Sequence, residues 1–428
     1  MKMLRGVVPL LLAVVSSQLQ TAGAELPPRL LETEIAPLLA EALERNPEVA
    51  AARARVDAAR ARISQARALP DPTVTLSYQN EGLSPSLGSS DDAFLAISAE
   101  QMVPWPGKRR LAADVAAASE LAAAAPLLRT ALALEAELRR VYADLLLARE
   151  LVALVEEQER TWVGIEAATR ARYSVGLAEQ QDVLRAQAER TRLIPMRVHE
   201  EGNVRMAVAE LNGLLNRPPE TPFPTPRRLT EQVPARVAAP ALGDLLPHLE
   251  ERSPELVGAR HGQERARREL ELARAGLRPD LVASASYMNR GALPAMVQGG
   301  IGFVLPLYAR GKQRQAIVEA EANLRAAAAE LESARLRVRV RVETNLAELV
   351  AAVAEAEPYA SGVLVQDRLA VDAALANYQA GKVPFVTVLE ALSTLYADRR
   401  THADRLAHVL WHEAEIYRLE PAEMKGSR

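Results

Sequence analysis

Hydrophobic positions follow a helical spacing over most of this chain, and only four short runs alternate with polar residues instead. The clearest helical pattern lies within residues 317–338, where a seven-residue hydrophobic repeat is accompanied by alanine three positions further on. The two series are Ile317, Leu324, Leu331 and Val338, and Ala320, Ala327 and Ala334. A sustained seven-residue repeat predicts coiled-coil packing, and alanine along the seam lets two helix axes approach closely.

Four short runs have the two-residue alternation that is typical of strands. In the first run, Val74, Leu76 and Tyr78 alternate with polar side chains. The four runs are 73–79, 93–103, 281–288 and 296–305. The members of each pair are separated by polar residues and glycine, as in NEGLSPSLGSSDD, so the sequence predicts two β-hairpins.

The chain contains the same pattern twice. LERNPEVAAAR matches LEERSPELVGAR, VPWPGKRR matches LPLYARGKQR, and YSVGLAEQQDVL matches YQAGKVPFVTVL, in the same order. Proline-rich residues 216–247 separate the copies and predict a partly irregular connector. We therefore expect a leader at 1–24, a first repeat at 25–215, a second repeat at 248–420 and a tail at 421–428.

Each copy has the same order of expected elements. A helix over 38–68 or 245–275 precedes the hairpin, and a glycine-lysine step follows it. The next helix is expected to run for about 65 residues, or about 100 Å at 1.5 Å per residue. A sharp corner and a return helix of about 35 residues complete the copy.

Glycines and prolines mark the expected helix ends. Gly176 and Gly381 end the two long helices, and glycine suits the left-handed conformation at a helix C-terminus. Pro126, Pro195 and Pro358 fall inside expected helices, and each is expected to kink or break its helix. The sequence thus predicts two antiparallel helical hairpins, with the corners at one end and the β-hairpins at the other.

Residues 1–24 have the features of a secretory leader. Lys2 and Arg5 precede an apolar stretch, and Ala22-Gly23-Ala24 is a cleavage site of the expected type. Removing the leader takes away two basic residues and no acidic one, so the net charge falls from −3 to about −5. An acidic balance argues against nucleic acid as a partner. The chain has no cysteine, which excludes disulfides, thiolate metal sites and a lipidated N-terminal cysteine.

After the leader we expect no run of the roughly 20 apolar residues that a membrane-spanning helix needs. Any membrane crossing is therefore expected of the strands, as a closed barrel. Four strands cannot close a barrel, and even eight leave an interior only wide enough for side chains. A water-filled barrel needs three or more copies of the chain. The alternative is that the hairpins form a soluble sheet at the end of a helical stalk.

The ordered motifs resemble the TolC family of outer-membrane efflux proteins over residues 38–420. The resemblance is carried by NPEVAAARARVDAARARISQARALPDP, LPLYARGKQRQAIVEAEANLRAAAAELESAR and the two Tyr-x-x-Gly corners. It implies a mainly α fold with β: duplicated antiparallel coiled-coil hairpins and four transmembrane strands per chain. In that family three chains share a twelve-stranded outer-membrane barrel and a periplasmic helical tunnel.

The resemblance also implies a function and partners. The protein would be a homotrimeric exit duct in outer-membrane lipid, working with a periplasmic adaptor (membrane fusion) protein and an inner-membrane efflux pump. VPWPGKRR is similar to the heavy-metal-cation branch of the family.

The resemblance places functional residues at the corners and just beyond the second one. The adaptor-docking tip corresponds to Val175, Gly176, Leu177, Ala380, Gly381 and Lys382. Family members often place two inward acidic residues, three apart, at a gate, and the matching positions are Thr387 and Glu390. The first acid is missing, so three copies of Glu390 would form a single carboxylate ring. The alternatives are that the glycines serve only helix capping and that Glu390 is a solvated surface residue.

Other candidate chemistry is sparse. Gly107-Lys108 lacks the upstream glycine and the following Ser or Thr of a phosphate loop, so it is interpreted as a strand-to-helix transition. His408 and His412, with Glu415 nearby, have a spacing that can bind metal, although such a pair more often has a packing role. We expect no enzyme activity, cofactor or resident metal. The two function classes left open are a passive transport duct and a structural or adhesive coiled-coil protein of the cell envelope.

Overall fold

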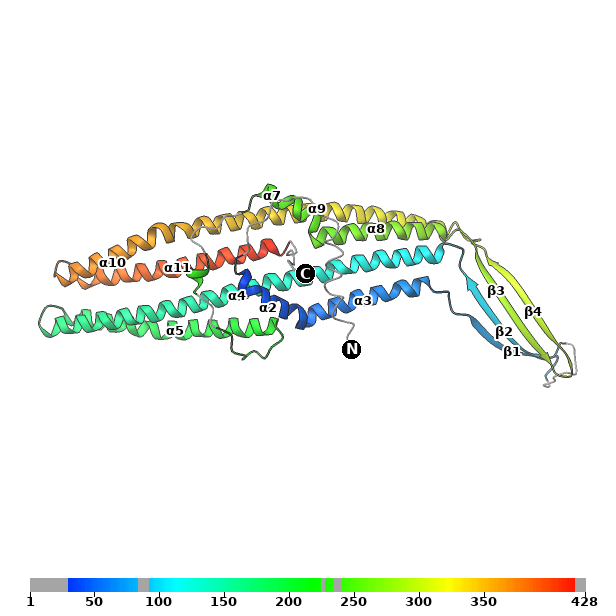
Figure 1. Ribbon diagram of the computed structural model, residues 1–428, viewed down its shortest axis with the longest axis horizontal. Coiled ribbons are helices and arrows are strands. Elements are labelled where there is room, and N and C mark those ends of the chain that lie inside the picture. Colours follow the sequence, from blue (N-terminus) through cyan, green and yellow to red (C-terminus); the bar gives the residue numbers. More distant parts are fainter. Residues whose placement is uncertain (1–29, 84–91, 225–227, 234–239, 420–428) are drawn as a thin grey trace. The chain divides into compact units, whose positions relative to one another are not determined.

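The computed structural model describes residues 30–83, 92–224, 228–233 and 240–419, so the expected leader lies outside the described residues. Figure 1 shows long helices and one small sheet. The elements are α2 (Glu32–Arg45), α3 (Pro47–Arg67), β1 (Thr73–Gln79), β2 (Phe94–Val103), α4 (Lys108–Ser174), α5 (Gln180–Leu214), α6 (Leu229–Gln232), α7 (Leu242–Arg252), α8 (Pro254–Ala275), β3 (Asp280–Arg290), β4 (Leu293–Val304), α9 (Gln313–Pro358), a π-helix (Tyr359–Val363), α10 (Leu364–Gln379) and α11 (Phe385–Tyr417).

Each repeat begins with two helices where one was expected. Asn46 separates α2 from α3, and Ser253 separates α7 from α8. The Asn46 side chain accepts hydrogen bonds from the amide of Glu48 at 2.9 Å and from the next amide at 3.4 Å, which caps α3. Proline is favoured at the first helical position. The expectation of one helix over 38–68 and one over 245–275 is wrong, because Asn-Pro and Ser-Pro start new helices.

The long helices tolerate two of the three internal prolines. The 67-residue α4 continues through Pro126, and the 35-residue α5 continues through Pro195. A kink or a break was expected at each position; neither helix is broken there, because a proline removes one hydrogen bond and the turns on both sides remain helical. Only at Pro358 does the α-helix end, and there the π-helix follows.

The seven-residue repeat of α9 lies on its packed side, as the sequence predicted. Leu331, Ala334 and Val338 are almost fully buried, and Ala320 is buried as well. The intervening positions of the helix are mainly exposed. The repeat therefore marks the seam along which α9 packs.

One described helix, α4, includes an 18-residue stretch apolar enough by composition to cross a membrane, with a mean hydropathy of 1.5. No such stretch was expected from the sequence. Alanine, which is abundant in α4, raises hydropathy without adding bulk. The same composition suits a helix that packs closely against other helices.

The described residues form two compact units, and each unit contains parts of both repeats. The sheet unit comprises Ala51–Leu127 and Glu255–Arg335. The corner unit comprises Leu128–Pro254, Leu336–Arg428 and the segment that ends at Ala50.

The sheet has four antiparallel strands in the order β1-β2-β3-β4, so the two predicted hairpins pair through β2 and β3. Directly paired residues point to the same face of a sheet. One face is mainly apolar and carries Val74, Leu76, Tyr78, Leu95, Ile97, Ala99, Leu281, Ala283, Ala285, Tyr287, Val297, Ile301 and Phe303. The other face is mixed: its polar residues are Thr73, Thr75, Ser77, Ser98, Glu100, Ser284, Ser286 and Gln298, and its apolar residues are Phe94, Ala96, Met102, Val282, Met288, Met296 and Val304. The predicted alternation is confirmed in β1 and is only partial in β2, β3 and β4.

Asp280, at the start of β3, fixes the start of α4. Its Oδ1 accepts a hydrogen bond from the Trp105 amide at 2.8 Å and pairs with Lys108 Nζ at 2.8 Å. Gly107 has a φ of 97°, which glycine adopts readily, and α4 begins at the next residue. The Gly107-Lys108 step is therefore a strand-to-helix transition, as the sequence predicted.

Candidate functional site

The two corners end their helices with the same backbone hydrogen bonds. Gly176 and Gly381 have φ values of 75° and 71°, in the left-handed region. The amides of Leu177 and Lys382 each donate to the carbonyl five residues earlier, at 2.8 and 2.9 Å. This is the Schellman arrangement, in which glycine avoids the steric cost of a Cβ. The prediction that both glycines are left-handed helix ends is confirmed.

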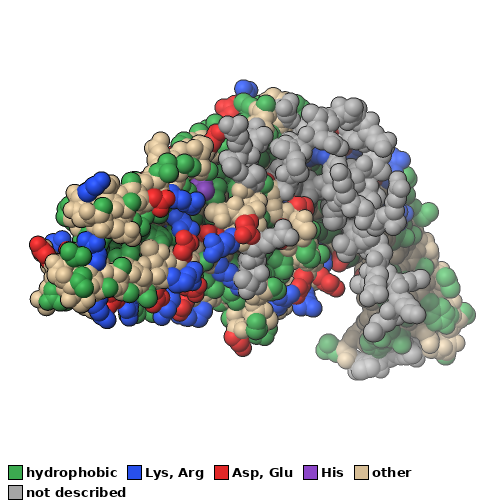
Figure 2. Space-filling view, turned by 60° about the vertical axis from the view of Figure 1, so that its left-hand side comes forward, with side chains coloured by type: hydrophobic (Ala, Val, Ile, Leu, Met, Phe, Trp, Pro, Cys, Tyr) green, Lys and Arg blue, Asp and Glu red, His purple; other side chains and the backbone are tan. Residues whose placement is uncertain are grey.

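All six predicted corner residues lie on the surface of the corner unit. Val175 and Leu177 are 67% and 64% exposed, and Ala380, Gly381 and Lys382 are exposed as well. Figure 2 shows mainly uncharged side chains at the end that carries the turns and both signs of charge interspersed along the helices behind it. Exposed apolar side chains beside a single lysine give this end a surface on which another protein can pack.

Arg172 joins the two corners, although the sequence analysis did not single it out. Its Nη1 donates to the Gln379 carbonyl at 2.9 Å, and its Nη2 donates to the Leu177 carbonyl at 3.2 Å. Its guanidinium also lies 4.9 Å from the centre of the Tyr378 ring. A planar guanidinium can make both kinds of contact at once. One feature of the sequence could have indicated this residue: the first corner has arginine at the position where the second corner has Asn377.

The second corner is more tightly packed than the first. Tyr378 is 8% exposed, and its ring lies 5.5 Å from that of Phe385, which is fully buried. Val388, one turn further along α11, is also fully buried. In the first corner the matching tyrosine, Tyr173, is 46% exposed. The position and orientation of α11 beyond its corner are therefore set by an aromatic cluster.

The two predicted gate positions lie in the first two turns of α11. The amide of Thr387 donates to the Pro384 carbonyl at 3.1 Å, and the side chain is half-buried. Glu390 is exposed. In the first repeat, Asp182 occupies the position that matches Thr387, and burial raises the pKa of its carboxyl. Asp182 in the first repeat is therefore partly buried, whereas Glu390 in the second repeat is exposed.

Two side-chain contacts join α4 to α11 at some distance from the corners. Both Nη atoms of Arg399 donate to the carboxylate of Glu157, at 2.6 and 2.9 Å. One turn along α4, the hydroxyls of Thr161 and Tyr396 share a hydrogen bond of 2.8 Å. The bidentate ion pair is the stronger of the two types of contact.

The Glu157–Arg399 pair is expected to make folding stability depend on pH. The hydrogen bond from Arg399 holds the pKa of the Glu157 carboxyl below its ordinary value of 4.5. Because the folded-state pKa is the lower one, the pair stabilises the fold above pH 4.5, and this contribution is lost as the pH falls through the folded-state pKa. Urea unfolding should therefore show a smaller difference between wild type and Glu157→Gln near pH 3 than at pH 7. An equal difference at both pH values would contradict the assignment.

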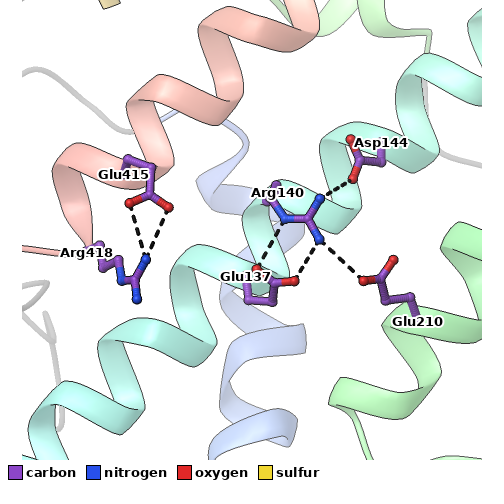
Figure 3. Close-up of polar contacts among 6 residues, drawn as sticks. All are labelled: Glu137, Arg140, Asp144, Glu210, Glu415 and Arg418. Carbon is purple, nitrogen blue, oxygen red and sulfur yellow. Dashed lines mark hydrogen bonds and ion pairs between the residues drawn. The ribbon is translucent and has the colours of Figure 1, made fainter. Parts of the chain in front are cut away.

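Arg140 ties α4 to α5 (Figure 3). Its guanidinium pairs with Glu137 at 2.7 Å and Asp144 at 3.0 Å on α4, and with Glu210 on α5 at 3.3 Å. Burial raises the pKa of the Asp144 carboxyl, and the charge of Arg140 opposes that rise. Figure 3 also shows Glu415 paired with Arg418. We assign this network a structural role, because all of these contacts are made within the chain.

The histidine pair on α11 lies apart from the corners. The rings of His408 and His412 are 6.4 Å apart, and His412 Nδ1 lies 3.4 Å from a carboxylate oxygen of Glu348. Glu415, the nearby acid in the sequence, pairs with Arg418 instead. Within the described residues, no group of three or more His, Cys, Asp or Glu side chains is placed to hold a metal ion.

Comparisons with known proteins agree with this architecture. The outer membrane efflux protein family matches residues 38–216 and 245–419. Outer membrane protein TolC of Escherichia coli K12 is 26% identical over 294 residues, which cover 64% of this chain and 58% of TolC. TolC of Salmonella enteritidis is 26% identical over 244 residues, which cover 53% of this chain. The chain thus spans 58% and 48% of the lengths of these relatives.

Solved channel structures share the fold. The outer-membrane channel OprN superposes with a TM-score of 0.75 at 20% identity, covering 90% of this chain and 89% of OprN. CusC superposes with a TM-score of 0.76 at 18% identity, covering 94% and 95%. VceC of Vibrio cholerae gives 0.73 at 20% identity, covering 90% and 96%. The family match extends over both repeats. The chain therefore belongs to the outer membrane efflux protein family and is an outer-membrane protein that extends into the periplasm.

Proposed function

We propose that three copies of this chain form a passive exit duct. Their sheets would close into a twelve-stranded barrel in the outer membrane, and their helical hairpins would continue it as a tunnel through the periplasm. The corners would dock to a periplasmic adaptor protein that links the duct to an inner-membrane efflux pump. No chemical step is assigned to the protein, because conduction needs only an open path.

The observation that carries the proposal is the two-faced sheet. Its apolar face suits lipid, and the Ser, Thr, Glu and Gln side chains of its mixed face suit water, which is the pattern of a membrane barrel wall. Strands β2, β3 and β4 have 10, 11 and 12 residues, close to the 9–11 that cross a bilayer when tilted. Within one chain β1 and β4 are edge strands. Joining β1 of one copy to β4 of the next would remove every edge.

Substitutions at the tips of the corners are expected to weaken adaptor binding. Leu177→Asp and Lys382→Glu change exposed side chains and leave both glycines in place. If the corners are the docking surface, each should lower adaptor affinity about tenfold or more and reduce export. Gly176→Ala is the control that tests helix capping alone: it changes the corner glycine and keeps Leu177 and Lys382. We expect it to lower the free energy of unfolding by about 1 kcal/mol. Intact adaptor crosslinking and export in both tip variants would remove the docking claim.

Glu390 is proposed as the gate residue, because it is exposed on the first turns of α11 near a corner. In a trimer, three carboxylates about 7 Å apart would repel one another by about 2.4 kcal/mol per pair at an effective dielectric near 20. Such a ring attracts cations, and a divalent ion can bridge it. Glu390→Ala is expected to reduce cation preference and divalent block in single-channel recordings. Unchanged selectivity and block would exclude Glu390 as the constriction, and Glu343→Ala is a control on an exposed α9 glutamate.

Heavy-metal cations are the proposed cargo. The support is the similarity of VPWPGKRR to the metal-exporting branch of the family. Cells that lack the protein should be tested against a panel of metal salts and drugs. Compared with wild-type cells, their sensitivity to metal salts should increase more than their sensitivity to drugs. Sensitivity to drugs alone would redirect the assignment to the drug-exporting branch.

A further inference from the structure

Four connecting segments join helices to strands at one edge of the sheet, within the sheet unit (Figure 1). They are residues 68–72, 104–107, 276–279 and 305–312. The register places the adjoining strand ends side by side. The terminal pairs are Thr73 with Glu100, Val103 with Leu281 and Asp280 with Val304. Residues from both repeats therefore lie along this edge.

Each of these segments carries a large apolar side chain. Leu307 and Tyr308 are 81% and 84% exposed, and Leu69 and Leu277 are exposed as well. Trp105 is half-buried in the segment that follows β2. Aromatic side chains at the ends of membrane strands are typical of the boundary between the hydrocarbon of a bilayer and water. This edge of the sheet therefore has the composition of a membrane surface layer.

Basic side chains accumulate beside these apolar ones. Lys108 pairs with Asp280 at 2.8 Å, and Arg109 donates to the Arg67 carbonyl at 3.2 Å. The four connecting segments contain one acidic residue, Asp71. Six basic side chains are exposed and make no ion pair with any residue that the structure describes. We call them the basic collar, which consists of Arg67, Arg110, Arg278, Arg310, Lys312 and Arg314.

The apolar and basic residues follow a fixed order along the chain in both repeats. Trp105 lies between the end of β2 and Arg110. Tyr308 lies in the same way between the end of β4 and Arg310. Apolar and then basic is the order that a bilayer surface favours, because hydrocarbon gives way there to charged headgroups. By contrast, the connection 80–93, which joins β1 to β2 at the other edge of the sheet, contains three acidic residues and no basic one.

We propose that the basic collar binds the headgroups of anionic phospholipids in the periplasmic leaflet of the outer membrane. Guanidinium and ammonium groups donate charge-assisted hydrogen bonds to phosphate oxygens, and the collar supplies both kinds of donor. Its positive charge is not balanced by acidic partners within the chain, so it complements an anionic surface. The inference rests on the proposed placement of the sheet in the membrane, and it needs neither the trimer nor the cargo.

Tryptophan fluorescence of the full-length protein in vesicles tests the proposal, because Trp105 lies beside the collar. Phosphatidylcholine vesicles receive brominated phosphatidylglycerol or brominated phosphatidylcholine at equal mole fraction. The anionic lipid should quench the fluorescence more strongly, and added salt should reduce this preference by screening. Trp105→Phe should remove the difference, since Trp162 and Trp411 belong to the corner unit.

A charge variant and a matched control locate the binding surface. Replacing Arg310, Lys312 and Arg314 by glutamine should lower the preference for phosphatidylglycerol at least about fivefold, which is the effect of one basic residue near an anionic surface. The control removes the same charge from exposed positions of the corner unit and should keep the preference. It combines Arg185→Gln, Arg205→Gln and Arg368→Gln.

The possible failures are distinguishable. Equal quenching of Trp105 by both brominated lipids would leave the sheet in the membrane and overturn the collar alone, as would an acidic protein being its partner instead. No quenching of Trp105 by either lipid would overturn the collar together with the membrane placement of the sheet. An equal loss of preference in the control variant would also overturn the collar. If the collar variant failed to fold, the wild-type protein would decide, because a preference that salt does not reduce would exclude charge recognition.

Discussion

Replacing Arg400 by methionine is expected to destabilise the corner unit by about 3 kcal/mol. Glu200 on α5 has a side chain that is only 1% exposed, and Arg400 on α11 donates to its Oε1 at 2.7 Å. Asn203 donates to the other oxygen at 2.8 Å. Without Arg400 the carboxylate would stay buried with one neutral donor. Removing one partner of a buried ion pair usually costs about 3–5 kcal/mol. We expect a loss at the low end of this range, because the Arg400 side chain is 40% exposed.

Urea unfolding in mild detergent measures this effect. Arg192→Met removes an arginine whose side chain is 70% exposed and should change the free energy of unfolding by no more than about 0.5 kcal/mol. The double variant Arg400→Met with Glu200→Leu should recover most of the loss, since it removes both charges. If Arg400→Met cost no more than Arg192→Met, the pair would not be important for stability.

An arginine at Ile97 is expected to prevent stable membrane insertion, with a cost of about 2–4 kcal/mol if this residue faces the middle of the bilayer. Ile97 lies on the apolar face of the sheet, paired with Leu76 on β1 and Tyr287 on β3. Ser98→Arg is the matched control, because the next side chain points to the opposite, polar face, between Thr75 and Ser286.

Membrane fractionation and heat stability of the extracted protein report the outcome. Ser98→Arg should insert normally and alter ion selectivity only, as expected for a residue that faces water. Equal tolerance of both substitutions would mean that the apolar face does not contact lipid. Loss of insertion in the Ser98 variant alone would reverse the assignment of the two faces.

The repeated pattern allowed much of the fold to be predicted. Strand alternation located the four strands to within about three residues, because the period of two is visible even in short runs. The helix starts at Pro47 and Pro254 were missed, since helical patterns continue on both sides of each proline. The helix at Pro126 was expected to kink or break and is not broken, because the residues around the proline keep it intact. The helix propensity of single residues does not include this effect of the neighbouring residues.

The candidate site was predictable in part. Gly176 and Gly381 were identifiable because the left-handed conformation they adopt favours one residue type. Arg172 was not, because its partners Gln379 and Tyr378 lie two hundred residues away in the other repeat. The π-helix Tyr359–Val363 was also not predicted.

The most direct test of the trimeric duct is the number of chains in the particle that conducts ions. Crosslinking of the purified protein in mild detergent, followed by recording from the same preparation in a planar bilayer, measures both properties. The proposal predicts a crosslinking ladder that ends at three chains and channel activity only in the three-chain fraction. A stable single chain that conducts ions would contradict it.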